Sequence, residues 1–100
     1  MDQHLQFTVS VEWQGDTRRA SNPRRAFDRD ALITSPGVDT TIAASAAPAF
    51  FGNQGRWNPE QLLLASLAQC HLLSYLYVAQ QRGIPVVAYA DAPGAVLEAT

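Results

Sequence analysis

The stretch NPEQLLLASLAQCHLLSYLYVAQQRG, residues 58–83, decides the fold because it carries strong signals for both ends of a helix. Asn58 is a good N-cap, Pro59 suits the first helical position, and Gln61 can complete a capping box. Gly83 is placed to end the helix in a left-handed conformation, and the proline two residues later cannot continue it. The pattern therefore predicts one long helix with defined ends.

Apolar residues cover most of the circumference of this predicted helix, residues 59–82, which would be about 36 Å long at about 1.5 Å per residue. A helix that is apolar all round is normally buried on every side. Polar side chains interrupt the apolar run, so a buried helix is favoured over a membrane span. One layer of strands in so small a domain cannot cover such a helix, and we expect a second subunit to cover the rest. The interrupting residues are Ser66, Gln69, His71 and Ser74.

The sequence on both sides of the helix predicts strands. Leu5, Phe7, Val9, Val11 and Trp13 alternate with polar residues, which is the period of a half-buried strand. The order of elements predicts an α+β fold with antiparallel strands packed on a long central helix, in one domain over residues 1–100. Further strands are expected over 27–33, 40–44, 84–89 and 95–99, with turns at 35–37 and 91–94.

Composition and charge exclude several classes of protein. Seven Lys+Arg against nine Asp+Glu give a formal net charge of −2, so no strong field would attract nucleic acid. All seven bases are arginines, and the four within residues 18–25 lie among polar residues and a proline that indicate a solvated loop. The single cysteine excludes an intrachain disulfide framework, and the polar residues 1–6 lack the apolar core of a signal peptide. We therefore expect a cytoplasmic protein with a reduced thiol and no membrane or nucleic-acid partner.

Cys70 has the most reactive side chain in the predicted helix, but its position alone does not assign a function. A lone cysteine in an apolar helix is usually a small core residue. His71 follows it, yet neighbours on a helix point about 100° apart, so the two side chains diverge and form no catalytic dyad. Two histidines and one cysteine are too few and too scattered for a zinc site, and we predict no metal and no cofactor.

The stretch from Arg56 to His71 resembles the central-helix signature of the OsmC/Ohr family of thiol peroxidases. In that family an Asn-Pro-Glu-Gln/Glu-Leu opening is followed, after small and apolar residues, by a cysteine ten positions beyond the glutamate. Glu60 and Cys70 keep this spacing. The stretch 27–37 is similar to a strand and turn that precede the central helix in one branch of the family. The region 83–94, with its own predicted strand and turn, also resembles that branch. The resemblance thus covers nearly all of the chain, with the helix as its specific part.

The resemblance implies an OsmC-like fold in which two chains intertwine as a homodimer and their central helices pack back to back. It also implies an enzyme that reduces organic hydroperoxides. Cys70 would be the thiol that attacks the peroxide, Glu60 the motif glutamate and an arginine its partner. The implied partners are a second copy of the chain, an organic hydroperoxide, and an external dithiol such as a lipoylated or thioredoxin-like protein.

The chemistry of these roles is coherent. The thiolate is the nucleophile, and a free cysteine with a pKa of about 8.5 is mostly protonated at neutral pH. A nearby guanidinium would favour the thiolate and polarise the peroxide, while a glutamate would hold that guanidinium in one orientation. Attack leaves a sulfenic acid at Cys70, which condenses with a second thiol to form a disulfide.

The spacing of Glu60 and Cys70 adds a geometric constraint. Ten residues of helix separate them by about 15 Å, so they cannot share a site within one straight helix. If both serve one catalytic centre, Glu60 must reach the cysteine of another subunit or act through a bridging arginine. We therefore expect an active site at the dimer interface. Simple complementation of the helix dipole is the other explanation for Glu60.

The arginine of the expected site is chosen by its strand position. Arg29 shares the inward face of the strand predicted over 27–33, and an arginine in an apolar row needs a charged partner. An edge strand whose arginine reaches solvent would explain the same pattern. Arg56, just before the helix, and Arg18 or Arg19, near the first strand, are the alternatives.

The aromatic residues and several polar helix residues have two explanations each. Four aromatic side chains either line an apolar substrate pocket or pack in the core: Trp13, Phe50, Phe51 and Trp57. Packing or interface roles are expected for Gln69, His71, Tyr75 and Tyr77.

The chain departs from the family in one respect. Family members normally continue with a second helix that bears a resolving cysteine, and we expect the present chain to be truncated before that helix. Three functions are weighed: organic hydroperoxide reduction at Cys70, a non-enzymatic dimer that binds a small ligand or is structural with Cys70 in its core, and a thiol-dependent enzyme of another kind, such as a hydrolase. The hydrolase lacks a positioned histidine base.

Overall fold

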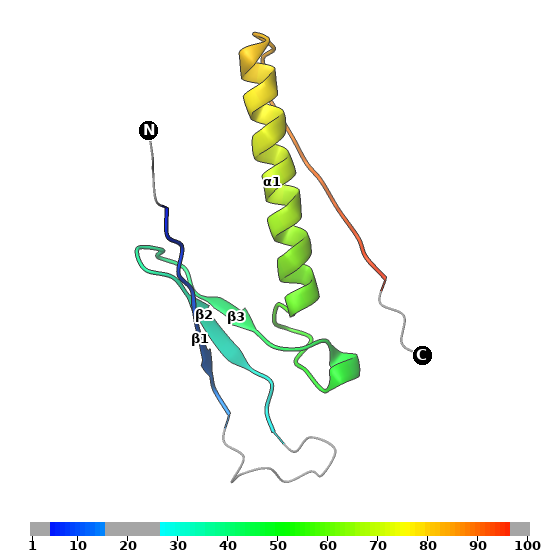
Figure 1. The fold of residues 1–100 in the computed structure, drawn as a ribbon. Coiled ribbons are helices and arrows are strands. Elements are labelled where there is room, and N and C mark those ends of the chain that lie inside the picture. The colour runs from blue at the N-terminus through cyan, green and yellow to red at the C-terminus, as the bar shows by residue number, and fades with distance from the viewer. Residues whose placement is uncertain (1–4, 16–26, 97–100) are drawn as a thin grey trace. The chain divides into compact units, whose positions relative to one another are not determined.

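The sequence before the helix forms a small antiparallel sheet with the strand order β1-β2-β3 (Figure 1). The structure is a computed structural model that describes residues 5–15 and 27–96. It divides into two compact units, Met1–Pro59 and Glu60–Thr100. The sheet belongs to the first unit, and its strands are β1 (Ser10–Trp13), β2 (Ala31–Thr34) and β3 (Ile42–Ala44).

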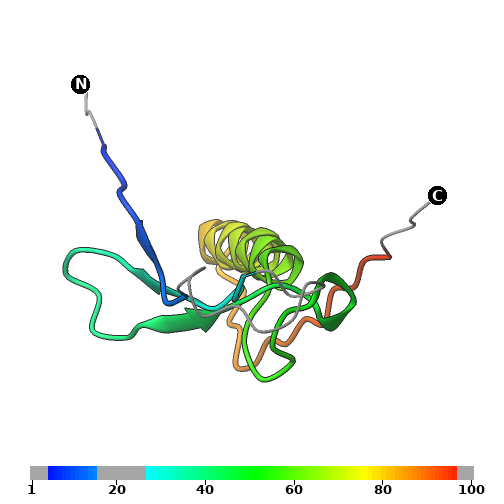
Figure 2. The same ribbon diagram turned by 90° about the horizontal axis from the view of Figure 1, so that it is seen from below.

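The register of the sheet places several of its apolar residues on one face. Val11 pairs with Ile33, which pairs with Ile42 on the other side, and Trp13 pairs with Ala31. Residues directly opposite in neighbouring strands lie on the same face. Figure 2, turned by 90°, shows the long connection between β2 and β3 at one end of this sheet.

The three strands before the helix are confirmed, but each is shorter than predicted. Residues 5–9 do not join β1, because β2 ends at Thr34 opposite Ser10 and the chain then turns away. The turn is closed by a hydrogen bond from the Val38 amide to the Ser35 carbonyl at 3.1 Å, with Gly37 at φ 80°. A φ of that sign at the third turn position is the glycine position of a type II turn, with Pro36 preceding it.

The prediction that Arg29 lies on the second strand is wrong. β2 begins at Ala31, whose partner is Trp13, the last residue of β1. Beyond that pair, one backbone bond continues the ladder, from the Gln14 amide to the Asp30 carbonyl at 2.9 Å. Arg29 therefore lies in the lead-in to β2, where no described strand pairs with it.

A tight loop joins the sheet to the start of the helix. The Trp57 amide donates to the Ala43 carbonyl at 3.0 Å, and the Ser45 amide donates to the Trp57 carbonyl at 2.7 Å. These bonds form a parallel bridge between Trp57 and Ala44 and fix the residue before the helix cap to the edge of β3. The chain between Ala44 and Trp57 contains the short 3₁₀ helix η3 (Pro48–Phe50).

The helix α1 (Pro59–Gln81) is confirmed within one residue of its predicted end. Pro59 is its first residue, as predicted. At its C-terminus the Ile84 amide donates to the Ala79 carbonyl at 2.9 Å, and the Gly83 amide donates to the Gln80 carbonyl at 3.1 Å. With Gly83 at φ 67°, this pair of bonds is a Schellman motif, which confirms the role predicted for that glycine.

The strands and the turn predicted after the helix are wrong over the residues that the structure describes. Residues 84–96 run back along α1 as an extended segment (orange to red in Figure 1) that forms neither a strand nor a hydrogen-bonded turn. A strand needs a ladder partner, and no described strand lies beside this segment. The remainder of the strand predicted over 95–99 lies outside the described residues.

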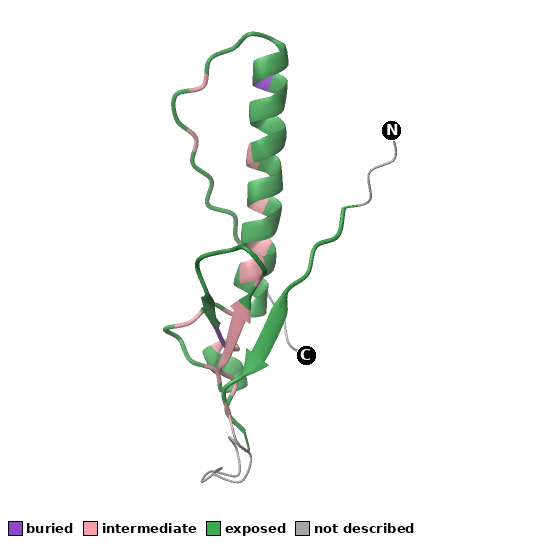
Figure 3. Ribbon diagram, turned by 90° about the vertical axis from the view of Figure 1, so that its left-hand side faces the viewer, coloured by how far each residue is buried: buried purple, intermediate pink, exposed green. Residues whose placement is uncertain are grey.

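Burial all round the helix is not reached within the single chain. Ala79 is the one buried residue of α1, and exposed positions cover most of its length (Figure 3). In the first unit the buried described residues are Ala44 and Ser45. So small a core cannot by itself offset the conformational entropy that folding removes.

We predict that Gly52→Ala destabilises the first unit. A Cβ atom at Gly52 would collide with the backbone of Ala46. The Gly52 amide also donates to the Ala47 carbonyl at 3.0 Å, and this bond holds the two backbone segments together, so they cannot separate to make room. Overpacking of this kind costs about 1–3 kcal/mol. The free energy of unfolding from chemical denaturation, at one fixed protein concentration, measures it.

Gly94→Ala is the matched control, because a Cβ atom there meets nothing within 4 Å. Its effect should stay within about 0.5 kcal/mol. Equal stability of the two variants would contradict the close approach at Gly52.

Candidate functional site

Cys70 lies halfway along α1 and is exposed in the single chain. Residues three, four and seven positions away lie within about 60° of it around the helix axis. Four of them are large apolar or aromatic side chains that are more than half exposed: Leu63 (61%), Leu67 (59%), Leu73 (56%) and Tyr77 (63%). We call these four residues the Cys70 stripe. The thiol is thus at the centre of an exposed apolar helix face.

No Asp, Glu, Lys or Arg lies between Gln61 and Gln81. A positive charge favours the thiolate form of a cysteine, but the helix supplies none within two turns of Cys70. The nearest charges on the same chain segment are Glu60 at the first turn and Arg82 just beyond the last residue of α1. Any group that activates the thiol electrostatically therefore comes from outside α1.

Glu60 is exposed in the first turn of α1. Because α1 is continuous from Pro59 to Gln81, ten residues separate Glu60 from Cys70, a rise of about 15 Å. The two side chains also point about 80° apart around the axis. The helix therefore keeps the two residues apart, and this confirms what their spacing predicted.

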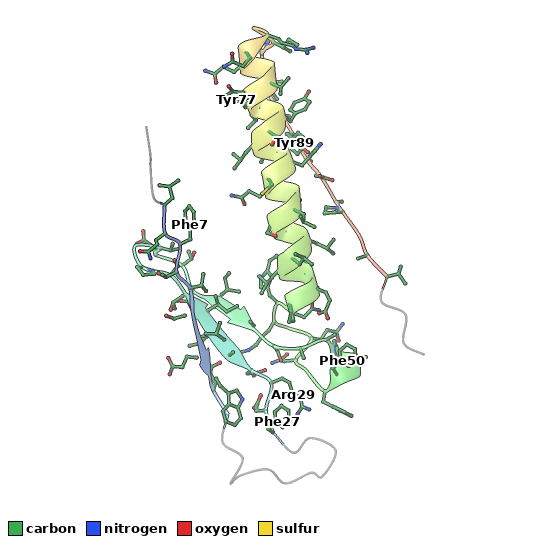
Figure 4. The ribbon with its side chains drawn as sticks, viewed as in Figure 1. Phe7, Phe27, Arg29, Phe50, Tyr77 and Tyr89 are labelled. Atoms are coloured by element: carbon green, nitrogen blue, oxygen red, sulfur yellow. The ribbon has the colours of Figure 1, made fainter. Side chains whose placement is uncertain are left out.

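His71 is engaged away from Cys70. Its Nδ1 atom lies 2.6 Å from the hydroxyl oxygen of Tyr89, and that hydroxyl donates to Oδ2 of Asp91 at 3.4 Å. The Tyr75 ring lies 5.5 Å from the Tyr89 ring, centroid to centroid, in a tilted arrangement. These four residues, the Tyr89 cluster, tie the extended segment 84–96 to α1. Figure 4 labels Tyr89 beside the helix.

The Tyr89 phenol is held in its protonated form. Partial burial raises the pKa of Tyr89 above its ordinary value of 10.0, and the nearby carboxylate of Asp91 raises it further. A phenol with a raised pKa is a poor nucleophile or base near neutral pH. Near neutral pH the phenol is therefore protonated while it contacts His71 and Asp91.

The two described arginines of the first unit are held in different ways. Nε of Arg56 lies 3.4 Å from Oδ2 of Asp30, with 24% and 21% of the two side chains exposed. Nη1 of Arg56 also donates to Oε1 of Gln14 at 2.6 Å and, more weakly, to the Ala31 carbonyl at 3.4 Å. A partly buried, multiply bonded guanidinium of this kind fixes the loop before α1 to the sheet.

Arg29 contacts aromatic rings instead. Its guanidinium carbon lies 3.6 Å from the centroid of the Phe27 ring and 5.7 Å from that of Phe51, and Nη1 donates to the Phe27 carbonyl. Figure 4 shows Arg29 beside Phe27 at the lower end of the sheet. Among the described residues no carboxylate pairs with Arg29.

The remaining predicted site residues are placed as follows. Arg18 and Arg19 lie outside the described residues. Arg29 belongs to the first unit, whereas Glu60 and Cys70 belong to the second, so their association stays a prediction. The aromatic residues expected in a pocket or core are nearly half exposed: Trp13, Phe50, Phe51 and Trp57.

Sequence reasoning missed three contacts that organise these residues. The Arg56–Asp30 ion pair joins positions 26 residues apart (56 − 30), and no local pattern signals it. The Tyr89–His71 contact was missed because the segment after Gly83 was predicted to be a strand. The Phe27–Arg29 contact follows from an i, i+2 pair outside a strand, where the two side chains are free to meet.

Two general features complete the description. Within residues 5–15 and 27–96, no group of three or more His, Cys, Asp or Glu side chains is placed to hold a metal ion. By length and composition α1 could cross a membrane, but the core helix of a soluble protein passes the same test.

We predict that Tyr89 ionises above pH 10.0, the ordinary tyrosine value. A raised pKa means that packing against α1 favours the protonated phenol. The phenol stabilises the packing of the segment 84–96 on α1. This stabilisation is therefore full below pH 10 and is lost as the pH rises through the raised pKa. A ¹³C-tyrosine NMR titration, with Tyr89→Phe to assign the signal, measures the midpoint.

Asp91→Asn removes a carboxylate that opposes ionisation, and the midpoint should fall towards the ordinary value. A midpoint that Asp91→Asn leaves unchanged would contradict the contact between the two side chains.

Comparison with known proteins gives a family match for the part of the chain that contains Cys70. Residues 52–98 match the family model described as OsmC-like protein, a range that contains α1, Cys70 and the Tyr89 cluster. The comparisons with curated proteins and with solved structures gave no match. The matched range includes the stretch 56–71, on which the specific part of the resemblance rested. Over residues 52–98, just under half of the chain, the sequence is thus that of an OsmC-like protein, which supports the resemblance.

Proposed function

We propose that this chain is a thiol peroxidase that reduces organic hydroperoxides at Cys70. The observation that carries the proposal is an exposed thiol at the centre of an OsmC-like helix, ten residues beyond Glu60. Exposure supports it, since a nucleophilic cysteine must meet its substrate. The apolar residues of the Cys70 stripe give the approaching peroxide an apolar surface, which suits an organic substrate.

The proposed reaction balances at the sulfur and the peroxide. The Cys70 thiolate attacks one peroxide oxygen, an S–O bond forms and the O–O bond breaks. The sulfur loses two electrons and becomes a sulfenic acid, while the leaving alkoxide takes a proton and departs as an alcohol. An external dithiol then condenses with the sulfenic acid, releases water and returns Cys70 to the thiol with formation of its own disulfide.

A homodimer is part of the proposal. The rise of about 15 Å between Glu60 and Cys70 keeps the two apart within one helix, so a shared centre draws them from two subunits. The exposed stripe on α1 supplies an apolar face of the kind that subunits bury. Packing of α1 against its copy would desolvate the neighbourhood of Cys70 and strengthen any charge interaction there.

Arg29 is the arginine we assign to the thiol. Arg56 is already paired with Asp30 and bonded to Gln14, so recruiting it would break an established ion pair. Arg29 keeps its charge without a carboxylate among the described residues. It is thus the described arginine of the first unit that is ready to accept a glutamate such as Glu60 and to polarise a peroxide oxygen.

The proposed setting is the cytoplasm, where thiols stay reduced and dithiol reductants are available. The proposed reductant is a lipoylated or thioredoxin-like protein. Its dithiol would have to reach Cys70 on the helix face.

A second function is favoured by one observation. Cys70 lies in the middle of the apolar stripe, so a dimer that buries the stripe completely would make the thiol a core residue. The chain would then be a non-enzymatic OsmC-like dimer that binds a small ligand or is structural. The reactivity of Cys70 in the assembled protein separates the two functions.

We predict that Cys70 reacts with an alkyl hydroperoxide at least about tenfold faster than a free thiol, which corresponds to about 1.4 kcal/mol of transition-state stabilisation. The reduced protein is exposed briefly to the hydroperoxide with a sulfenic-acid trap present, and intact mass gives the labelled fraction. Hydrogen peroxide should label it more slowly.

Cys70→Ser is the control for trap specificity, and circular dichroism establishes that both chains are folded. Labelling of the folded chain at the rate of a free thiol would rule out the peroxidase and favour the non-enzymatic dimer.

A further inference from the structure

We propose that Phe51 is a positioning residue: its ring and the ring of Phe27 together hold the Arg29 guanidinium in one orientation. This inference rests on the proposed function, because it assigns Arg29 to the reaction at Cys70. All three residues belong to the first unit, so their mutual geometry does not depend on where the second unit lies.

Two rings and one carbonyl hold the guanidinium. The guanidinium carbon lies over the Phe27 ring at 3.6 Å from its centroid and 5.7 Å from the Phe51 centroid, both within the range of a cation–π interaction. Nη1 donates to the Phe27 carbonyl. A guanidinium laid over a ring directs its remaining N–H donors outwards from its edges, where a carboxylate or a peroxide oxygen can accept them.

Phe51 reaches this place through an unusual backbone conformation. Its φ of 65° and ψ of 27° lie in the left-handed region, which a bulky residue rarely adopts. It is the only residue other than glycine with positive φ among the described residues. Strain of this kind persists only where the surroundings enforce it, and it gathers at functional positions.

The loop that enforces the conformation is closely bonded. The Phe51 amide donates to the Pro48 carbonyl at 3.0 Å, and the next amide, of Gly52, donates to the Ala47 carbonyl at 3.0 Å. The absence of a side chain at Gly52 lets the loop pass against Ala46. Residues other than Arg29 therefore fix the backbone conformation of Phe51. Because the position of the Phe51 ring does not depend on Arg29, the ring can restrain the guanidinium.

Phe51→Leu tests the proposal because it removes the ring and keeps an apolar side chain at the same backbone conformation. Loss of one cation–π contact should slow oxidation of Cys70 by an alkyl hydroperoxide about two- to fivefold. Phe51→Tyr keeps the aromatic face and should retain the original rate. Phe7→Leu is the same exchange at an exposed position that contacts no arginine of the described residues, and it should leave the rate unchanged.

Positioning is separated from mere packing by combining variants. In an Arg29→Gln background the Phe51→Leu exchange should have no further effect on the rate, because no guanidinium remains to be oriented. A Phe51→Leu effect that persists in that background would overturn the proposal, and so would a rate equal to that of the Phe7→Leu chain.

A second readout does not depend on peroxidase activity. NMR signals of the Arg29 Cδ protons are displaced by the ring currents of Phe27 and Phe51, and Phe51→Leu should shift them towards ordinary arginine values while Phe7→Leu does not. If Cys70 proved unreactive in the unchanged chain, the proposed function would fail, yet this comparison would still decide whether Phe51 orients Arg29. Arg29 signals that Phe51→Leu leaves in place would overturn the inference directly.

Discussion

The rest of the structure depends on the absence of charge from α1 between Gln61 and Gln81. The chain covers one side of this helix through the segment 84–96 and leaves the Cys70 stripe exposed. Exposed apolar surface on this scale normally marks a surface that another molecule buries. A helix without Lys or Arg also cannot stabilise a thiolate by charge, so both the burial of α1 and the activation of Cys70 require groups from beyond it.

The described arginines show how such a group is made ready. Arg56 has a structural role, because its ion pair with Asp30 and its hydrogen bond to Gln14 fix the loop before α1 to the sheet. Arg29 rests on Phe27 and near Phe51, which restrain its direction without neutralising its charge. A charge that is oriented, and that no carboxylate of the described residues pairs with, is suited to stabilise an anion brought from elsewhere, either a carboxylate or a thiolate.

Much of the fold was predictable, because its signals are local. The start of α1 at Pro59, the left-handed Gly83 and the three strands before the helix follow from capping residues, glycine preference and alternation. The errors arose where pairing decides the structure. Residues 84–96 have strand-like sequence but no described ladder partner, and the lead-in to β2 fell outside the sheet because β1 ends at Trp13.

The candidate site was predictable to a lesser degree. The family resemblance singled out Glu60 and Cys70, and their ten-residue spacing excluded a site within one helix. The continuous α1 keeps the two residues apart in this way. The partners of the arginines could not be foreseen, because an ion pair such as Arg56–Asp30 depends on loop geometry that no spacing encodes. Phe51 was predicted to line an apolar pocket or to pack in the core. Its contact with Arg29 could not be foreseen, since its left-handed backbone comes from the turn around it.

The most direct measurement of the central claim, a site shared between two subunits, is complementation between two inactive chains. A Cys70→Ser chain and a Glu60→Gln chain are mixed, dissociated and reassembled, and peroxide reduction is compared with that of each chain alone. If Glu60 of one subunit serves Cys70 of the other, each mixed dimer holds one intact site of two in a two-fold symmetric assembly. About half of a randomly reassembled preparation is mixed dimer, so the preparation should recover about a quarter of the normal activity. Mixed dimers that form but stay inactive would contradict a site built from both subunits.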